Sequence, residues 1–219
     1  MAQWSQCCLI PGRQVQIELS CRLYTVYLAG YTPSGRLTQS VPDQHVTVET
    51  RSGSSVAVWS QDMLHRYRLE RWWHPSRCYL NVIGLNPSTA TEAEDDPTIR
   101  RCIDYAREWG YDGLVMTNLY TLRSTDPKAL ERVFATQGPA YKDALLGAAI
   151  GAGRVLAAWG SVRQPYQAKW ADDLFVLLAK HDIQPMCLKV TRQGFPAHPL
   201  YQKRDVQPIP YAGRYAIGE

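Results

Sequence analysis

The chain has 219 residues, of which 45% are hydrophobic and 20% charged, and its formal net charge at pH 7 is +4. These proportions are typical of a folded globular protein and exclude an intrinsically disordered one. No apolar run approaches twenty residues and no secretory signal is evident, so we expect no transmembrane helix and a cytoplasmic protein. The mild basicity permits a polyanionic partner without requiring one.

The six cysteines form neither a C-x-x-C pair nor a cluster with histidine at zinc-binding spacing. We therefore expect no bound metal, no iron–sulfur cluster and no other cofactor. Arginines gather in "HRYRLER" and "TIRRC". On charge alone, these arginines are expected on the solvated surface.

The first part of the chain has the residue alternation of β-strands. Apolar and polar residues alternate in "VQIELSCRLYTVYLAG" and "HRYRLERWW", while "VTVETRSGSSVAVWS" is typical of a hairpin. We predict an N-terminal antiparallel β extension over residues 1–62, which is either a small appendage or an addition to the edge of the main sheet. Residues 63–219 are predicted to form one α/β domain.

In this second part, strand-like and helix-like periods alternate. Four apolar runs, "CYLNVIGL", "GLVMTN", "RVLAAWG" and "PMCLKV", have the length of buried strands. Between them, one helix is predicted to begin after an Asp95 or Asp96 cap and to end at Gly110, with further helices within 127–150 and over 164–180. This order predicts a three-layer α/β/α fold with a central parallel sheet.

Ligands of open parallel sheets bind at the carboxyl ends of the strands. In this chain, those ends carry "NPST", "TNLYTLRS", "WGSVRQ" and "TRQGFPAHPLY". The unusual polar residues of the sequence are therefore expected at one edge of one sheet. We expect a binding or catalytic site at that edge.

Three residues at this edge have side chains suited to such a site. The proline after Asn86 keeps that residue extended, so its amide could orient a water molecule or a substrate hydroxyl. Asn118 offers one acceptor and two donors, which are the groups needed to recognise the edge of a base. His198 lies between Pro196 and Pro199, which stiffen its backbone. As structural alternatives, either asparagine would satisfy loop backbone groups, and a loop histidine often has no special role.

Other residues near the strand ends also have two interpretations. Asp95 and Asp96 are expected to cap a helix, and a catalytic role for either is left open. Arg123 could bind a phosphate with both arms of its guanidinium group, or simply be solvated. Leu200 and Tyr201 either insert between DNA bases from an exposed rim or cover the edge of the core.

The stretch from about residue 65 to residue 201 resembles a family of bacterial and phage proteins described as a domain of unknown function. The matching segments are "YRLERWW", "LNPSTA", "DDPTIRRCIDYAREWGYDGL", "NLYTLRSTDP", "AAWG" and "HPLY". That family in turn resembles the uracil-DNA glycosylase superfamily. "GLNPS" is similar to its first motif, "TNLYTLRSTDP" to its base-reading segment and "AHPLY" to its His-Pro motif, although the Ser-Pro that usually follows His-Pro is absent. The resemblance implies a uracil-DNA glycosylase-like fold.

The resemblance also implies roles for individual residues. Asn86 would hold the attacking water and His198 would support the departing base. Asn118 and Ser88 would recognise that base. The implied contacts with DNA fall to charged and apolar residues around the site, namely Arg100, Arg101, Arg123, Leu200 and Tyr201.

The expected protein is therefore a monomeric DNA N-glycosylase that flips a base out of double-stranded DNA and leaves an abasic site. Uracil-specific pockets carry an aromatic residue after the first motif, whereas this loop is Ser88-Thr89-Ala90. The expected base is thus an enlarged C5-modified pyrimidine, such as the glucosylated hydroxymethylcytosine of phage DNA, and the expected role is phage defence. Two alternatives stay open: a nucleoside- or nucleotide-processing enzyme on the same scaffold, and a nucleic-acid-binding protein without catalysis.

Overall fold

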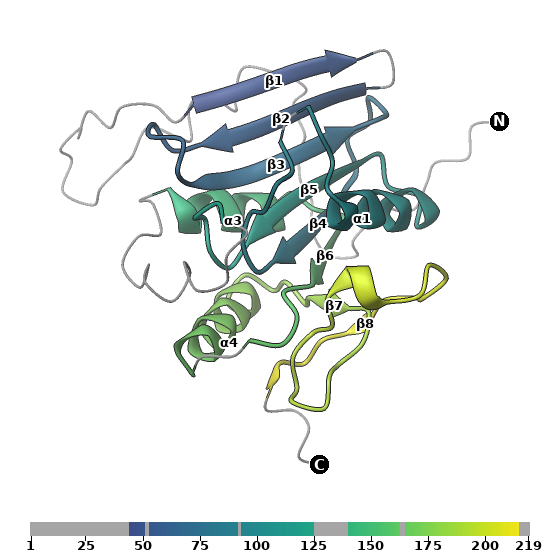
Figure 1. Cartoon of the computed structure of the whole chain (residues 1–219). Helices are drawn as coiled ribbons and strands as arrows, with labels where there is room; N and C mark the ends of the chain where they lie inside the picture. The colour runs from purple at the N-terminus through teal and green to yellow at the C-terminus, as the bar shows by residue number, and fades with distance from the viewer. Residues whose placement is uncertain (1–43, 51–52, 92, 125–139, 163–164, 215–219) are drawn as a thin grey trace.

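The computed structural model describes residues 44–50, 53–91, 93–124, 140–162 and 165–214 (Figure 1). The predicted strand within 15–30 and any helix within 127–139 lie outside these ranges. The described strands are β1 (Gln44–Thr50), β2 (Gly53–Trp59), β3 (Arg66–Trp72), β4 (Tyr79–Gly84), β5 (Gly113–Asn118), β6 (Arg154–Ala157), β7 (Met186–Cys187) and β8 (Ile209–Pro210). The described helices are α1 (Pro97–Glu108), α3 (Tyr141–Ile150), α4 (Pro165–Ala179) and the short 3-10 helix η3 (Pro199–Tyr201).

All these strands belong to one sheet with the order β1-β2-β3-β5-β4-β6-β7-β8. The four central strands, β5, β4, β6 and β7, are parallel, whereas the strands on either side pair antiparallel. Every residue of β4 and β5 is buried, as expected for parallel strands covered on both faces. The prediction of an α/β fold with a parallel centre is confirmed.

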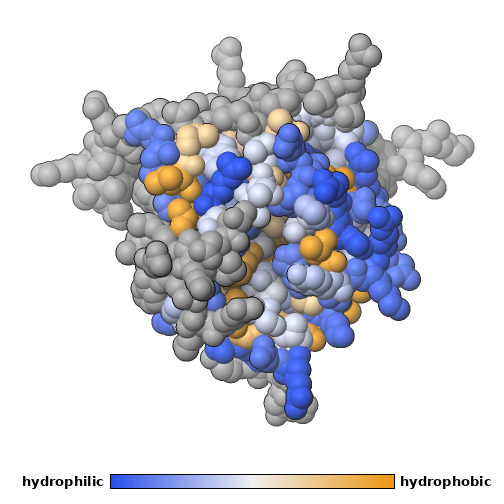
Figure 2. Space-filling model, viewed as in Figure 1, coloured by the Kyte–Doolittle hydropathy of each residue, from blue (hydrophilic) through white to orange (hydrophobic). Residues whose placement is uncertain are grey.

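Helices cover the two faces of the parallel strands. Leu80 and Val82 of β4 belong to the hydrophobic cluster that α1 completes, whereas Ile83 belongs to the cluster of α3 and α4. Neighbouring residues of a strand point to opposite faces, so α1 lies on one side of the sheet and the other two helices on the opposite side. The outer surface of α1 is hydrophilic, as the blue region at the right of Figure 2 shows.

The N-terminal strands continue this sheet. β1 and β2 form the predicted hairpin, with Thr50 opposite Gly53. β3 pairs with β2 and with β5, so the hairpin is joined to the parallel strands through β3. Of the two predicted arrangements, the structure has the addition to the edge of the main sheet, and the predicted boundary after residue 62 falls between β2 and β3.

The predicted ends of α1 are confirmed. The side chain of Asp96 accepts a hydrogen bond from the backbone N–H of Ile99 at 2.8 Å, Pro97 is the first helical residue, and Gly110 follows the C-cap with a φ of +78°. Asp96 rather than Asp95 is therefore the cap. Because α1 connects two parallel strands, it runs antiparallel to them, and its N-terminus lies at the carboxyl edge of the sheet.

In the described part of the chain, no helix has both the length and the apolar character needed to cross a membrane.

Candidate active site

The carboxyl ends of β4 and β6 lie side by side, and the chain leaves them in opposite directions. β4 continues through α1 to β5 on one side, while β6 continues through α4 to β7 on the other. Such a reversal of strand order leaves a crevice above the carboxyl ends, which is where ligands of open α/β sheets bind. The predicted site residues follow these strands and their neighbours.

The amide of Asn118 lies beside Gly84 at this edge. The two residues are register partners in β5 and β4, and a Cβ on Gly84 would come within 2.7 Å of Asn118 Oδ1. The missing side chain of Gly84 therefore provides the space that the amide occupies. Asn118 is only 3% exposed, and its side chain forms no hydrogen bond with another described residue. A buried amide without a protein partner is available to a ligand.

The amide of Asn86 is anchored by its nitrogen. Nδ2 donates to the backbone oxygen of Ser124 at 2.7 Å and to that of Pro87 at 3.0 Å. Because both partners are carbonyl acceptors, the NH2 end of the amide must face them. Oδ1 is thus held in a fixed direction as an acceptor. The predicted loop-stabilising role accounts for the nitrogen, and the oxygen can still orient a water molecule.

His198 belongs to the segment of chain that follows β7. In space it packs beside the residues that follow the carboxyl end of β6. Its Nδ1 accepts a hydrogen bond from the backbone N–H of Leu200 at 3.3 Å, so the neutral ring carries its proton on Nε2. Gly160, with a φ of +76°, packs against it, and a Cβ there would lie 3.3 Å from the Cβ of His198. Burial lowers the pKa of His198, while the Asp96 carboxylate opposes that shift. A neutral Nε2–H donor results.

Asn86, Asn118 and His198 therefore lie along the same edge. Backbone hydrogen bonds from Leu119 to Gly84 and from Ser124 to Pro87 join the segments that follow β5 and β4. Among the described residues, no hydrogen bond or ring contact joins any two of the three predicted side chains. Each is positioned by its own strand end and is independent of the other two.

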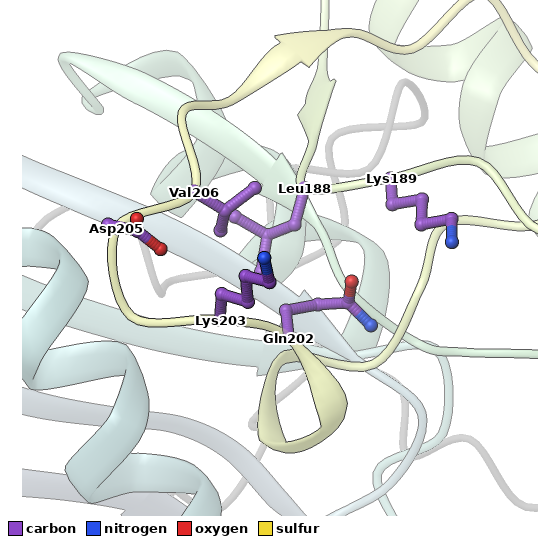
Figure 3. A pocket seen from close by; sticks show the side chains of 6 residues that line it. All are labelled: Leu188, Lys189, Gln202, Lys203, Asp205 and Val206. Atoms are coloured by element: carbon purple, nitrogen blue, oxygen red, sulfur yellow. The ribbon is translucent and has the colours of Figure 1, made fainter.

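A cavity of about 410 Å³ lies between the segment after β7 and the loop after η3 (Figure 3). These two segments contribute the side chains around it, which Figure 3 shows. Its lining combines two apolar residues with charged and polar ones: Leu188, Lys189, Gln202, Lys203, Asp205 and Val206. None of the three predicted side chains lines it.

The loop after β4 is held by arginines from β3 and from the segment after β5. Each backbone oxygen of residues 88–91 accepts a hydrogen bond from a guanidinium group. The pairs are Arg123 with Ser88 at 3.1 Å and with Thr89 at 3.3 Å, Arg66 with Ala90 at 2.5 Å, and Arg71 with Thr91 at 2.5 Å. Sequence reasoning missed this arrangement, because the residues of each pair are at least twenty positions apart.

The expectation that the "HRYRLER" arginines are solvated is wrong for Arg66 and Arg71, which are 3% and 9% exposed. Their burial is stable because a guanidinium group can satisfy several acceptors at once. Arg71 also pairs with the Asp95 carboxylate at 2.8 Å and donates to the hydroxyl of Ser55. Asp95 is therefore bound to Arg71 and is not the helix cap.

The two arginines of α1 that the resemblance places on DNA also contact backbone oxygens. Arg100 donates to Asp95 O, and Arg101 donates to Gln202 O at 3.2 Å. In addition, the hydroxyl of Tyr105 donates to Lys203 O at 2.6 Å. α1 thus fixes the segment directly after η3.

η3 carries the two residues predicted to enter DNA. Tyr201 is 80% exposed, and its ring centroid lies 5.5 Å from that of His198. Leu200 is half-buried. Tyr201, rather than Leu200, therefore projects from the rim, and its backbone is held in place by α1.

The family model described as "Protein of unknown function (DUF1643)" matches residues 66–200, well over half of the chain. The chain belongs to this family. The matched region begins at β3 and ends within η3, so it contains every predicted site residue except Tyr201. A search of curated proteins and a search of solved structures each returned no match. The resemblance to the uracil-DNA glycosylase superfamily stays a prediction.

Within the described residues, no group of three or more His, Cys, Asp or Glu side chains is placed to hold a metal ion.

Proposed function

We propose that this protein is a DNA N-glycosylase that excises an enlarged, C5-modified pyrimidine. The observation that carries the proposal is the buried amide of Asn118, which has no hydrogen-bond partner among the described residues and lies beside Gly84 at the sheet edge. A base edge offers the donors and acceptors that such an amide can recognise.

The neighbouring groups fit the charge changes of base excision. As the base–sugar bond breaks, the sugar gains oxocarbenium character and negative charge moves onto the departing base. The neutral His198 ring presents Nε2–H as a donor for an oxygen of that base. Asn86 Oδ1 accepts a hydrogen bond from the water that attacks C1′. Because an amide is not a strong base, the enzyme is slow or acts on bases that leave easily.

The size of the base is inferred from the loop after β4. Ser88, Thr89 and Ala90 carry small side chains, and arginines hold their backbone oxygens in place. A base bound next to this loop would have room beside the C5 position of a pyrimidine. The proposed substrate is therefore a pyrimidine with a bulky C5 group, such as glucosylated hydroxymethylcytosine in phage DNA, and the proposed role is phage defence.

Double-stranded DNA is the proposed partner because Tyr201 projects from the rim beside His198. An exposed aromatic ring that is fixed at its backbone can fill the space left by a flipped nucleotide. The hydrogen bonds from Arg101 and Tyr105 to the segment after η3 fix that backbone.

One observation favours a second candidate. Arg100, Arg101 and Arg123, which the resemblance assigns to DNA phosphates, already donate to backbone oxygens. An enzyme that removes the base from a free nucleoside or nucleotide would use the same edge without these arginines. Release of base from the modified nucleoside and not from the duplex would support this second candidate.

The proposal is tested with duplexes that contain cytosine, uracil, hydroxymethylcytosine or its glucosylated form, followed by detection of abasic sites. We expect abasic sites in the modified duplexes, and a rate loss of about 100-fold in Asn86→Ala and in His198→Ala. His74→Ala is the matched control, because His74 is exposed and lies in the turn before β4, at the opposite edge of the sheet. Cleavage of uracil DNA alone would exclude the modified-base substrate, and absence of abasic sites in all duplexes would contradict the glycosylase.

A further inference from the structure

The peptide groups of the loop after β4 all direct their carbonyl oxygens toward the body of the protein. Pro87 O accepts hydrogen bonds from the side chain of Asn86 and from the backbone of Ser124. The four oxygens that follow, in residues 88–91, accept from the three arginines. The oxygens of Pro87, Ser88 and Thr89 are thus bound by the Arg123–Ser124 segment, whereas those of Ala90 and Thr91 are bound by arginines of β3.

The N–H groups of these peptides consequently point the other way. In a trans peptide the N–H is opposite to the C=O of the same plane, and the structure has no cis peptide bond in the described residues. The N–H of Thr91 donates to Glu94 O at 2.9 Å. In the described part of the chain, the N–H groups of Ser88 and Thr89 donate to no other group. Ala90 is only 1% exposed, so its N–H is closed to a ligand.

The positive charge of Arg123 lies behind these two donors. Arg123 forms no ion pair with a described carboxylate, and its guanidinium group lies 5.5 Å from the centre of the Trp59 ring. Asp95, further along the same loop, is paired with Arg71 at 2.8 Å. Successive backbone N–H groups in a positive field form an anion-binding site of the kind that holds phosphate.

We propose that the backbone N–H groups of Ser88 and Thr89 bind the oxygens of a phosphate group. This inference rests on the proposed function, in which the phosphate belongs to the strand that carries the target base. It also gives the three arginines a role. Their guanidinium groups donate to the carbonyl oxygens of the loop and so fix the direction of its N–H groups. A free nucleotide offers the same phosphate chemistry, and the test separates the two sources.

The first measurement follows the backbone amide resonances of the full chain by NMR. Inorganic phosphate, deoxycytidine 5′-monophosphate and a short unmodified duplex are titrated separately. We expect the amides of residues 88 and 89 to shift progressively and to saturate. Saturation at a lower concentration of duplex than of mononucleotide identifies the DNA backbone as the source, and the reverse order identifies a nucleotide. If these amides stay unchanged with all three probes, the phosphate site does not exist.

The second measurement removes one donor. Thr89→Pro lacks the N–H, whereas the matched variant Thr89→Ala keeps it and removes only the side-chain hydroxyl and methyl groups. We expect at least roughly tenfold weaker phosphate binding in Thr89→Pro, and less than about a threefold change in Thr89→Ala. Equal affinities in the two variants would overturn the proposal. If the proline variant does not fold, the wild-type titration decides.

The two proposals fail in different experiments. Phosphate binding is measured without catalysis, so loss of the N–H donors can be seen in a protein that shows no base release. Conversely, base release from a modified duplex with no shift at residues 88 and 89 would retain the glycosylase and overturn only the phosphate site.

Discussion

Gly84 and Asn118 face each other across β4 and β5, and the asparagine amide occupies the space that a side chain at residue 84 would fill. A Cβ at that position would come 2.6 Å from Met116 Cε and 2.7 Å from Asn118 Oδ1. The position of the proposed base-recognising group therefore depends on the absence of a side chain in the neighbouring strand.

This relationship predicts that Gly84→Ala lowers base release by more than its loss of folding stability alone would explain. The added methyl group must displace the Asn118 amide, since contacts of this length are not sustained. We expect a loss of roughly 2 kcal/mol in the free energy of unfolding, measured with urea, and near-complete loss of base release in protein that is still folded. The control is Gly147→Ala in α3, where a Cβ meets nothing within 4 Å. It should raise stability by up to about 1 kcal/mol and leave activity unchanged.

A second prediction concerns Arg71, which joins β3 to the loop after β4. Replacement by alanine leaves the Asp95 carboxylate and several buried acceptors without their donor. We expect the free energy of unfolding to fall by about 3 kcal/mol. Lys169→Ala is the comparison, since its ion pair with Asp173 is solvent-exposed and such pairs contribute little. Equal urea midpoints for the two variants would contradict the buried clamp.

Local sequence patterns predicted much of this fold. Short apolar runs predicted the four central strands. An Asp-Pro pair at the start and a glycine at the end predicted α1. Both signals lie within neighbouring residues, so a single sequence shows them. The antiparallel addition of β1–β3 was one of two open arrangements, since alternation shows a strand but not its partner.

The contacts that build the edge could not be predicted in the same way. The pairing of Arg71 with Asp95 and the packing of Gly84 against Asn118 join residues more than twenty positions apart. A single sequence places the carboxyl ends of parallel strands together, which identified Asn86, Asn118 and His198 as candidates. It does not show which side-chain donors form hydrogen bonds within the folded chain. For this reason the sequence places the arginines in solvent or on DNA, although they bind backbone oxygens of the protein.

A third prediction concerns the titration of His198. Burial lowers its pKa below the usual 6.5, and the Asp96 carboxylate raises it. Asp96→Asn keeps a capping side chain and removes the charge, so the pKa of His198 should fall further. The measurement is the pH dependence of the His198 ring resonances. An unchanged or higher midpoint in the variant would show that Asp96 does not act on the ring.

The same lowered pKa predicts acid destabilisation. The unfolded chain takes up the His198 proton at a higher pH than the folded chain does, so stability falls as the pH drops below about 6.5 and through the pKa of the folded state. His65 contributes in the same direction, because burial also lowers its pKa. In His198→Gln, the urea midpoint should depend less on pH over this range. A pH dependence identical to that of the wild type would contradict the assignment.

A fourth prediction separates the two residues of η3. Tyr201 is 80% exposed, so Tyr201→Ala should leave the free energy of unfolding within about 0.5 kcal/mol while lowering base release from duplex DNA by at least about tenfold. The half-buried Leu200 should show the opposite balance in Leu200→Ala, with a larger loss of stability. Equal activity of Tyr201→Ala and wild type on duplex DNA would contradict the proposed role of Tyr201 in DNA binding.

The most direct test of the site is a crystal structure of Asn86→Ala bound to a duplex that carries the modified base. The account predicts a flipped base beside Gly84, with the Asn118 amide and His198 Nε2 each at about 3 Å from a polar atom of the base. A base bound in the cavity lined by Leu188 and Val206, or one that contacts neither side chain, would contradict the account.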